Sequence, residues 1–162
     1  MPGMQGGAFM HEIAAKGLAC SYAMTPEFVS YQKQVIVNAQ AMAHFFMSKN
    51  YTVISAGTDT HLFVIDVRPL GLTGKDAEQL LESAEIYVNR NVIPFDTLPA
   101  LTAGGIRIGT AAITTRGAQI NHVIEIAHII DELFVSRDVS KAYAKVRSVV
   151  YDLESVVKIQ DW

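Results

Sequence analysis

Three short stretches of the 162-residue sequence combine residue types that bind anions or polar rings. Gly6-Gly7 directly precedes a predicted helix, where free backbone N–H groups and the positive end of the helix dipole can hold a phosphate. Arg107 stands in the middle of an apolar run flanked by Gly105 and Gly109. A buried guanidinium must be paired, and its forked N–H groups suit a carboxylate bidentately. Asn89-Arg90-Asn91 is a polar stretch at a predicted strand end, facing a loop with two prolines and two glycines.

Each stretch also has a purely structural explanation. The two glycines can be a flexible chain start, and the polar triplet can be a turn signal. Arg107 can form a structural ion pair, for example with Asp66 or Asp96. Residue types alone leave both explanations open for all three.

Other chemistries find no support. Gly74-Lys75 resembles the end of a phosphate-binding P-loop, but Pro69 stands where the first glycine belongs and Asp76 replaces the Ser/Thr. No G-x-S-x-G elbow of a hydrolase is present. No metal site is predicted, because no pair of metal-ligand spacing occurs among the five histidines, His11, His44, His61, His122 and His128.

Composition predicts a folded domain, part of whose surface is covered by another domain or another chain. Half of the residues are hydrophobic and 18% are charged, against about 25% in a typical free-standing domain. With 13 basic and 16 acidic side chains the net charge is −3, which argues against nucleic-acid or anionic-membrane partners. The single cysteine, Cys20, excludes an intrachain disulfide and is expected to be a buried thiol. No signal peptide and no spanning segment are evident, so we expect a cytoplasmic location.

Periodicity and capping signals predict an α+β fold with a mostly antiparallel sheet packed with helices. Thr25-Pro26-Glu27 is typical of a helix start, and Thr73 is the expected cap of a second helix. Helices are predicted over 8–24, 28–49, 74–85, 118–135 and 139–158, strands over 51–55, 61–67, 86–93 and 105–109, and a loop over 94–105.

Five ordered motifs resemble the serine hydroxymethyltransferase family, the pyridoxal-phosphate enzymes that interconvert serine and glycine with tetrahydrofolate. Pro2-Gly3-Met4-Gln5-Gly6-Gly7, with His11 and Ala14-Ala15-Lys16, is similar to P-G-x-Q-G-G…H-x-I-A-A-K. The other four are Gly57-Thr58-Asp59-Thr60-His61-Leu62 (with Thr60 for the usual Asn), Leu72-Thr73-Gly74-Lys75, Asn89-Arg90-Asn91-x-x-Pro94 and Gly105-Ile106-Arg107-Ile108-Gly109-Thr110, followed in register by 112–117.

The resemblance implies a C-terminal portion of such an enzyme. Residues 1–30 would be a helical piece of the large domain of this fold-type I enzyme, and residues 31–162 its small α+β domain. The family's Schiff-base lysine lies upstream in an S-T-T-H-K-type motif, and no Thr-His-Lys occurs in this sequence. We therefore expect the chain by itself to bind neither pyridoxal 5'-phosphate nor tetrahydrofolate, and to be inactive without the lysine.

The matching motifs imply site roles at four positions. Arg107 would bind the carboxylate of serine or glycine and so orient the substrate. Gly7, with Gly6 beside it, would donate a backbone N–H to the cofactor phosphate of the second subunit of a homodimer. Asn91 would complete the cofactor-binding set by hydrogen-bonding the pterin of the folate.

One loop departs from the family pattern. The family often reads S-P-F-V-T-S-G before the arginine motif, whereas this chain has Pro99-Ala100-Leu101-Thr102-Ala103-Gly104, which puts folate affinity in question. Two alternative functions stay open: a non-catalytic binding module of the same fold, and another enzyme of the same cofactor fold. The G-T-D-x-H-L and N-x-N-x-x-P motifs argue against the second.

Overall fold

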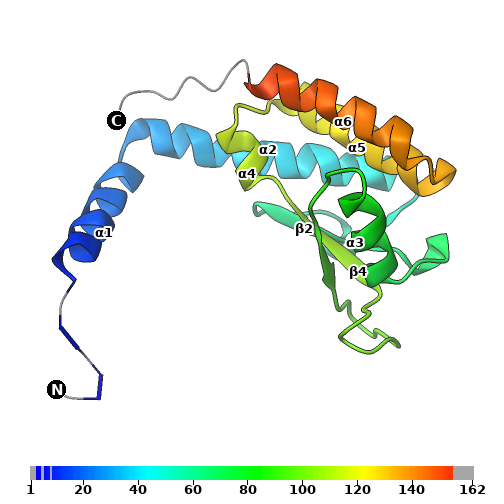
Figure 1. The fold of residues 1–162 in the computed structure, drawn as a ribbon, viewed down its shortest axis with the longest axis horizontal. Coiled ribbons are helices and arrows are strands. Elements are labelled where there is room, and N and C mark those ends of the chain that lie inside the picture. Colours follow the sequence, from blue (N-terminus) through cyan, green and yellow to red (C-terminus); the bar gives the residue numbers. More distant parts are fainter. Residues whose placement is uncertain (1–2, 5, 8, 155–162) are drawn as a thin grey trace. The chain divides into compact units, whose positions relative to one another are not determined.

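The computed structural model describes residues 3–4, 6–7 and 9–154 and divides the chain into two compact units, residues 1–33 and 34–162 (Figure 1). Helix α2, Pro26–Ser48, runs through the boundary between them.

The first unit contains helix α1, Met10–Ala23, and the beginning of α2. The predicted start of α2 is confirmed, because Pro26 is its first residue and the Thr25 side-chain oxygen accepts the N–H of Phe28 at 3.2 Å. No residue of α1 is buried, so the expectation of a buried Cys20 is wrong: its thiol is exposed. The physical reason is that an Ala-rich helix buries a side chain only where another element packs on it.

The second unit is built on a four-stranded antiparallel sheet, as the sequence predicted, in the order β1-β2-β4-β3. The strands are β1 Thr52–Val53, β2 Leu62–Asp66, β3 Asn89–Asn91 and β4 Gly105–Gly109. β3 is shorter than the predicted 86–93, because it lies at the edge of the sheet and only its three residues pair with β4.

The two faces of the sheet differ in burial. Phe63 and Ile65 of β2 and Ile106 and Ile108 of β4 alternate onto an inner face and are at most 5% exposed. The outer face carries the residues between them, and these are half-buried or exposed: Leu62, Val64, Asp66, Asn89, Asn91 and Arg107. The hydrophobic core therefore lies on one side of the sheet.

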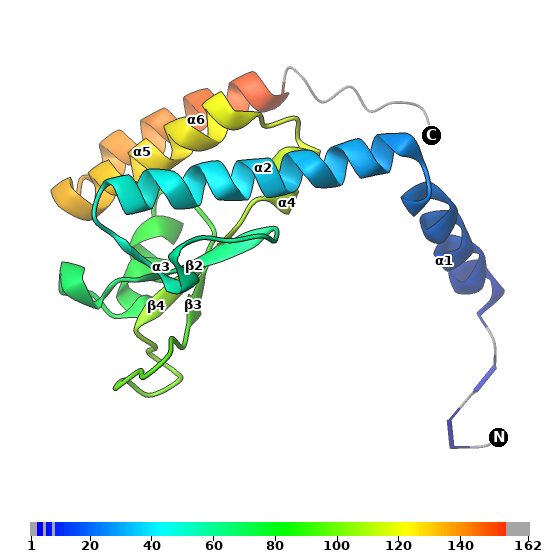
Figure 2. The ribbon, with the colours of Figure 1, turned by 180° about the vertical axis from the view of Figure 1, so that it is seen from behind.

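Helices supply the rest of this core. Within the second unit α2 lies beside α5 (Ile120–Ser136) and α6 (Val139–Glu154), and α3 (Gly74–Glu82) packs against β3 and β4 (Figures 1 and 2). The predicted stripe on α2 is confirmed, with Val35, Ala39, Met42, Ala43 and Phe46 all buried. The predicted cap of α3 is also confirmed, because Thr73 and Asp76 form a reciprocal capping box.

Three short helical segments were not predicted: α4, Ala111–Thr115, and the 3₁₀ turns Ile54–Ala56 and Arg68–Leu70. They are too short for an apolar periodicity to reveal them. The predicted continuation of the last helix over 155–158 falls outside the described residues. Within residues 3–4, 6–7 and 9–154, none of the helices has both the length and the apolar character that a membrane crossing requires.

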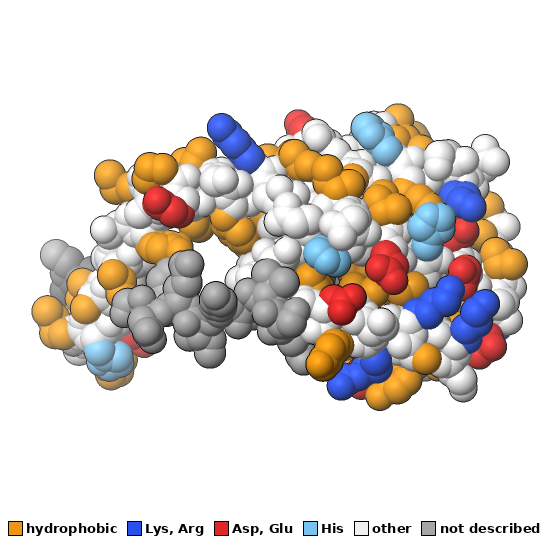
Figure 3. All heavy atoms as spheres, turned by 90° about the horizontal axis from the view of Figure 1, so that it is seen from above, with side chains coloured by type: hydrophobic (Ala, Val, Ile, Leu, Met, Phe, Trp, Pro, Cys, Tyr) orange, Lys and Arg blue, Asp and Glu red, His pale blue; other side chains and the backbone are white. Residues whose placement is uncertain are grey.

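Charged residues of both signs are interspersed on the face that Figure 3 shows. Ion pairs also join α5 to α6, where Lys145 Nζ lies 2.7 Å and Lys141 Nζ 3.6 Å from Glu132 Oε2. This face therefore has no continuous field of one sign.

Candidate functional site

Arg107 lies on the outer face of the sheet, at the centre of β4. It pairs with Val64 of β2 on one side and with Asn89 of β3 on the other. Its side chain is exposed, so the expectation of a buried guanidinium is wrong. The reason is the strand alternation: Ile106 and Ile108 occupy the inner face, and the residue between them must point outward.

The predicted ion-pair partners of Arg107 are engaged elsewhere. Asp66 pairs with Arg68, with Nη2 of the arginine 2.8 Å from Oδ2 and Nε 3.0 Å from Oδ1, and these side-chain hydrogen bonds hold the pKa of Asp66 below its usual value. Asp96 accepts backbone N–H groups instead, as described below. The structural ion pair is therefore not formed with either carboxylate.

The one hydrogen-bond partner of Arg107 among the described residues is the residue opposite it. Nη2 of Arg107 donates to Oδ1 of Asn89 at 3.0 Å, and this hydrogen bond holds one side of the guanidinium group in place. The Arg107 side chain is exposed on the outer face of the sheet. An arginine held by one arm and open at the other is suited to receive a carboxylate through two parallel hydrogen bonds.

Asn91 shares this face with Arg107. It stands opposite Gly105, two pairs along from the Asn89–Arg107 pair, so the Asn91 and Arg107 side chains project from neighbouring strands on the same side of the sheet. Asn91 is half-buried, and its Nδ2 donates to the carbonyl of Val92 at 2.6 Å. The predicted Asn91 and Arg107 are thus brought together, and Asn89 is a third polar residue of the site to which no role had been assigned.

The loop between β3 and β4 is folded around one carboxylate. Asp96 accepts the N–H groups of Leu98 at 3.0 Å, Gly104 at 2.7 Å and Ile93 at 3.3 Å. These bonds, the one from Leu98 first, hold the pKa of Asp96 below its usual value. Two large apolar side chains of the same loop are left in solvent, Phe95 at 97% and Leu101 at 77% exposure.

The same loop explains why the Gly74-Lys75 segment is not a phosphate cradle. The N–H of Gly74 donates to the carbonyl of Ala103 at 2.8 Å, and the N–H of Lys75 donates to the carbonyl of Thr102 at 2.9 Å. The donors at the start of α3 that a phosphate would need are therefore bound to the loop.

Gly6 and Gly7 belong to the first unit. Both are exposed, and among the described residues no atom beyond their own chain neighbours lies within 4 Å of the place where a Cβ would stand. They do not abut the helix directly, because Phe9 is the N-cap of α1 and Met10 its first residue. A phosphate fits such a segment on steric grounds, since its backbone can be approached without obstruction.

A buried polar network anchors the end of β4, and sequence reasoning did not find it. The hydroxyl of Thr110 donates to the carbonyl of Val35 at 2.8 Å, and the hydroxyl of Thr114 donates to the carbonyl of Thr110 at 2.7 Å. Asn38 donates to Thr114 Oγ1 and to the carbonyl of Ala118, both at 2.9 Å. Asn38 lies inside the apolar stripe of α2, where a single amide gives no periodic signal.

No group of three or more metal-ligating side chains occurs in the part of the chain that the structure describes. Among its lysines, Lys49, Lys141 and Lys145 form ion pairs on the helices. The candidate site consists of Arg107, Asn89 and Asn91 on the outer face of the sheet, and of the loop that connects β3 to β4.

Comparison with known proteins gives a consistent likeness over most of the chain. The family model described as serine hydroxymethyltransferase matches residues 1–130. The serine hydroxymethyltransferase of Coprothermobacter proteolyticus is 46% identical over 152 residues, which cover 94% of this chain and 36% of that protein. The chain therefore spans little more than a third of the length of the curated relative that it matches.

Proposed function

The chain belongs to the serine hydroxymethyltransferase family, pyridoxal-phosphate-dependent transferases of one-carbon metabolism, and from this premise we propose that it supplies substrate, phosphate and folate contacts to an enzyme that interconverts serine and glycine. The one-carbon unit would pass to or from tetrahydrofolate. In this proposal residues 1–30 form a helical piece of the large domain of a fold-type I enzyme, and residues 31–162 form the small domain.

The observation that carries the proposal is the geometry of Arg107. Its Nη2 donates to Asn89 Oδ1 at 3.0 Å, and its side chain is exposed on the outer face of the sheet, where an amino acid could approach it. A carboxylate bound by this fork is fixed in direction as well as position, which orients the bonds at the α-carbon for reaction.

The cofactor would meet the chain at the first unit. Pyridoxal phosphate, when bound, supplies a ring that withdraws electrons from the α-carbon of the amino acid. Gly7, with Gly6 beside it, would donate a backbone N–H to its phosphate in the second subunit of a homodimer. The unobstructed space around both glycines supports this role.

Folate contacts would come from the β3 end of the site. Asn91 lies on the same sheet face as Arg107 and presents an amide, which can both donate to and accept from a pterin ring. The exposed Phe95 and Leu101 lie in the loop that follows β3. The sequence of this loop departs from the family pattern, so we expect the affinity for folate to differ from that of family members that keep the pattern.

The Schiff-base lysine would come from outside these 162 residues, because the sequence has no Thr-His-Lys. We expect the chain by itself to be inactive. The alternative, a binding module without catalysis, keeps the carboxylate fork but needs no lysine from elsewhere.

Substitution of Arg107 in a chimera tests the proposal. This chain replaces the matching segment of the Coprothermobacter proteolyticus enzyme, and serine cleavage is measured with tetrahydrofolate. Arg107→Lys keeps the charge but loses the fork, so we expect the KM for serine to rise roughly tenfold to a hundredfold.

Arg90→Lys is the matched control. Arg90 lies on the neighbouring strand and pairs with Glu78 of α3, so its substitution is expected to leave the KM for serine within about twofold. Equal effects of the two substitutions would refute the carboxylate role of Arg107. Turnover by the 162-residue chain alone, measured in the same assay, would contradict the need for a lysine from elsewhere.

A further inference from the structure

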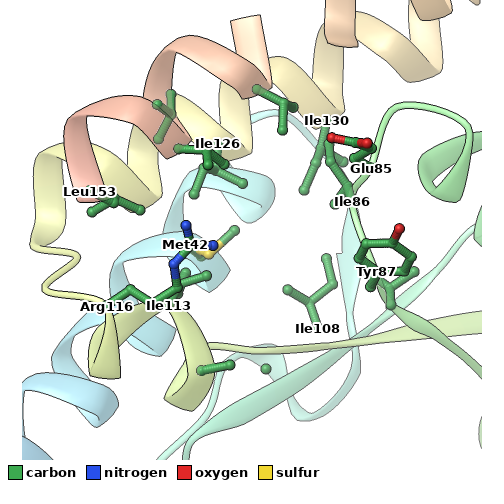
Figure 4. A pocket seen from close by; sticks show the side chains of 16 residues that line it. Met42, Glu85, Ile86, Tyr87, Ile108, Ile113, Arg116, Ile126, Ile130 and Leu153 are labelled. Atoms are coloured by element: carbon green, nitrogen blue, oxygen red, sulfur yellow. The ribbon is translucent and has the colours of Figure 1, made fainter. Parts of the chain in front are cut away.

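Asn89 of β3 is placed to hold Arg107 without touching the hydrophobic core. The two residues stand directly opposite each other in the antiparallel pair of β3 and β4, and both are exposed on the outer face of the sheet. On the inner face, Ile108 lines an apolar pocket with Met42 and Ile130 (Figure 4), and Asn89 is not one of the residues that line it. A substitution at position 89 therefore changes the surroundings of Arg107 and leaves the packing of the core intact.

The hydrogen bond between these two residues has a neutral acceptor. Nη2 of Arg107 donates to Oδ1 of Asn89 at 3.0 Å. Because the acceptor is an amide oxygen, the bond restrains the guanidinium and leaves its positive charge uncompensated. An aspartate at this position would instead form a charge-assisted pair with the guanidinium, and a substrate carboxylate would then have to displace it.

The carboxylates around the site are bound by other groups. Asp66 lies on the same face of the sheet, on β2, and its two oxygens accept from the Arg68 side chain at 3.0 and 2.8 Å. Glu78 of α3 pairs with Arg90 of β3. Among the described residues no carboxylate forms an ion pair with Arg107. The positive charge of Arg107 is therefore not neutralised within this part of the chain.

We propose that Asn89 is a positioning residue for the substrate carboxylate: its amide oxygen holds the Arg107 guanidinium in place and leaves the charge of Arg107 available to serine or glycine. This inference rests on the proposed function, because it assumes that Arg107 binds the substrate. An arginine side chain loses rotamer freedom when it binds a ligand, and a hydrogen bond that already restrains it reduces this loss. An uncharged acceptor gives this benefit without competing for the cation.

Asn89→Ala and Asn89→Asp, made in the chimera with the Coprothermobacter proteolyticus enzyme, separate this role from a merely structural one. The alanine variant loses the restraint and keeps the charge, so we expect the KM for serine to rise about threefold. The aspartate variant keeps the hydrogen bond but neutralises the charge, so the KM should rise roughly tenfold to a hundredfold. Asparagine and aspartate have nearly the same shape, so a merely structural role predicts the opposite order. The Kd for glycine, measured by calorimetry without tetrahydrofolate, should rise in the same order as the KM for serine.

Asn121→Asp is the matched control, because it adds the same charge at an exposed position of α5, which packs against the core on the inner side of the sheet. It should leave the KM for serine within about twofold. Neither substitution of Asn89 should change the KM for tetrahydrofolate by more than about twofold, although Asn91, the proposed folate contact, also lies on β3. A KM for tetrahydrofolate that rises together with that for serine would indicate a distorted strand and would overturn the positioning role. An Asn89→Asp chimera that binds serine better than Asn89→Ala would overturn it as well.

The Arg107→Lys chimera distinguishes failure of this inference from failure of the proposed function. If Arg107→Lys raises the KM for serine and Asn89→Asp does not, the role of Asn89 is wrong and the carboxylate role of Arg107 stands. If Arg107→Lys leaves the KM for serine unchanged, the proposed function is wrong and the role of Asn89 with it.

Discussion

The two glycines that flank Arg107 have different reasons to be glycine. A Cβ on Gly105 would lie 2.5 Å from Cγ2 of Ile93 and 2.8 Å from the carbonyl oxygen of Ile65, and both distances are shorter than a Cβ makes to another heavy atom in folded proteins. A Cβ on Gly109 would meet nothing nearer than 3.8 Å. The close packing of β4 against the loop from β3 therefore requires a glycine at 105 but not at 109.

Alanine substitutions at these two positions should differ sharply in stability. We expect Gly105→Ala to lower the free energy of unfolding by about 1–3 kcal/mol, because Ile93 or the strand must move to admit the methyl group. Gly109→Ala should change it by no more than about 0.5 kcal/mol. Urea unfolding of both variants measures the difference, and a Gly105→Ala variant as stable as Gly109→Ala would show that the loop adapts freely.

Among the elements, the contact between α2 and α4 depends on buried polar groups. Asn38 is fully buried, and it joins α2 to Thr114 of α4 and to Ala118 after it, through two bonds of 2.9 Å. Its own Oδ1 accepts from Gln34 at 2.9 Å. Because every polar atom of this amide has a partner, replacing it leaves several groups in the interior without one.

Asn38→Leu should be strongly destabilising for this reason. Leucine has a similar size but no hydrogen-bonding atoms, so the carbonyl of Ala118 and the amide of Gln34 lose their partner, at a cost of about 2–4 kcal/mol in the free energy of unfolding. Gln40→Leu is the control on the same helix: it removes one long bond of 3.3 Å to the carbonyl of Thr58 and should cost less than about 1 kcal/mol. Similar midpoints of thermal unfolding for the two variants would show that the hydrogen bonds of Asn38 between α2 and α4 are not essential for stability.

The elements also show what could be predicted from sequence. Capping residues and periodic stripes act over one helix, and so Thr25, Thr73 and the buried face of α2 were predicted correctly. Burial depends on which element lies opposite, and this is why Cys20 and Arg107 were assigned to the wrong environment. Asn91 and Arg107 were identified by motif, but their shared face follows from strand register, which only the folded sheet provides.

For the whole molecule, the titratable groups define a pH range of stability. Hydrogen bonds from Arg68, Thr73, Leu98 and Lys145 are the largest causes that lower the pKa values of Asp66, Asp76, Asp96 and Glu132, respectively. Burial, and then the hydrogen bond to Asp131, raises the pKa of Tyr51. The carboxylates therefore stabilise the fold above about pH 4, and the neutral phenol stabilises it below about pH 10.

Stability should accordingly fall at both ends of the pH scale. Below about pH 4 the unfolded chain takes up protons before the folded one, and above about pH 10 the unfolded tyrosine ionises first. Urea midpoints measured from pH 3 to pH 11 test this. Asp96→Asn should reduce the loss of stability at acid pH and leave the loss at alkaline pH unchanged. Tyr51→Phe should reduce the loss of stability at alkaline pH and leave the loss at acid pH unchanged. If either variant loses stability at acid and at alkaline pH as steeply as the unsubstituted chain, the role given to that residue in the pH dependence is wrong.

The strand order has a consequence for association between copies of the chain. The two central strands, β2 and β4, have five residues each, whereas the outer strands, β1 and β3, have two and three. A sheet can grow when another chain pairs with the free backbone N–H and C=O groups of an edge strand. Here each edge strand has very few such groups, and the edge strand β3 also carries the charged Arg90. The sheet is thereby protected against the edge-to-edge polymerisation that leads to fibrils.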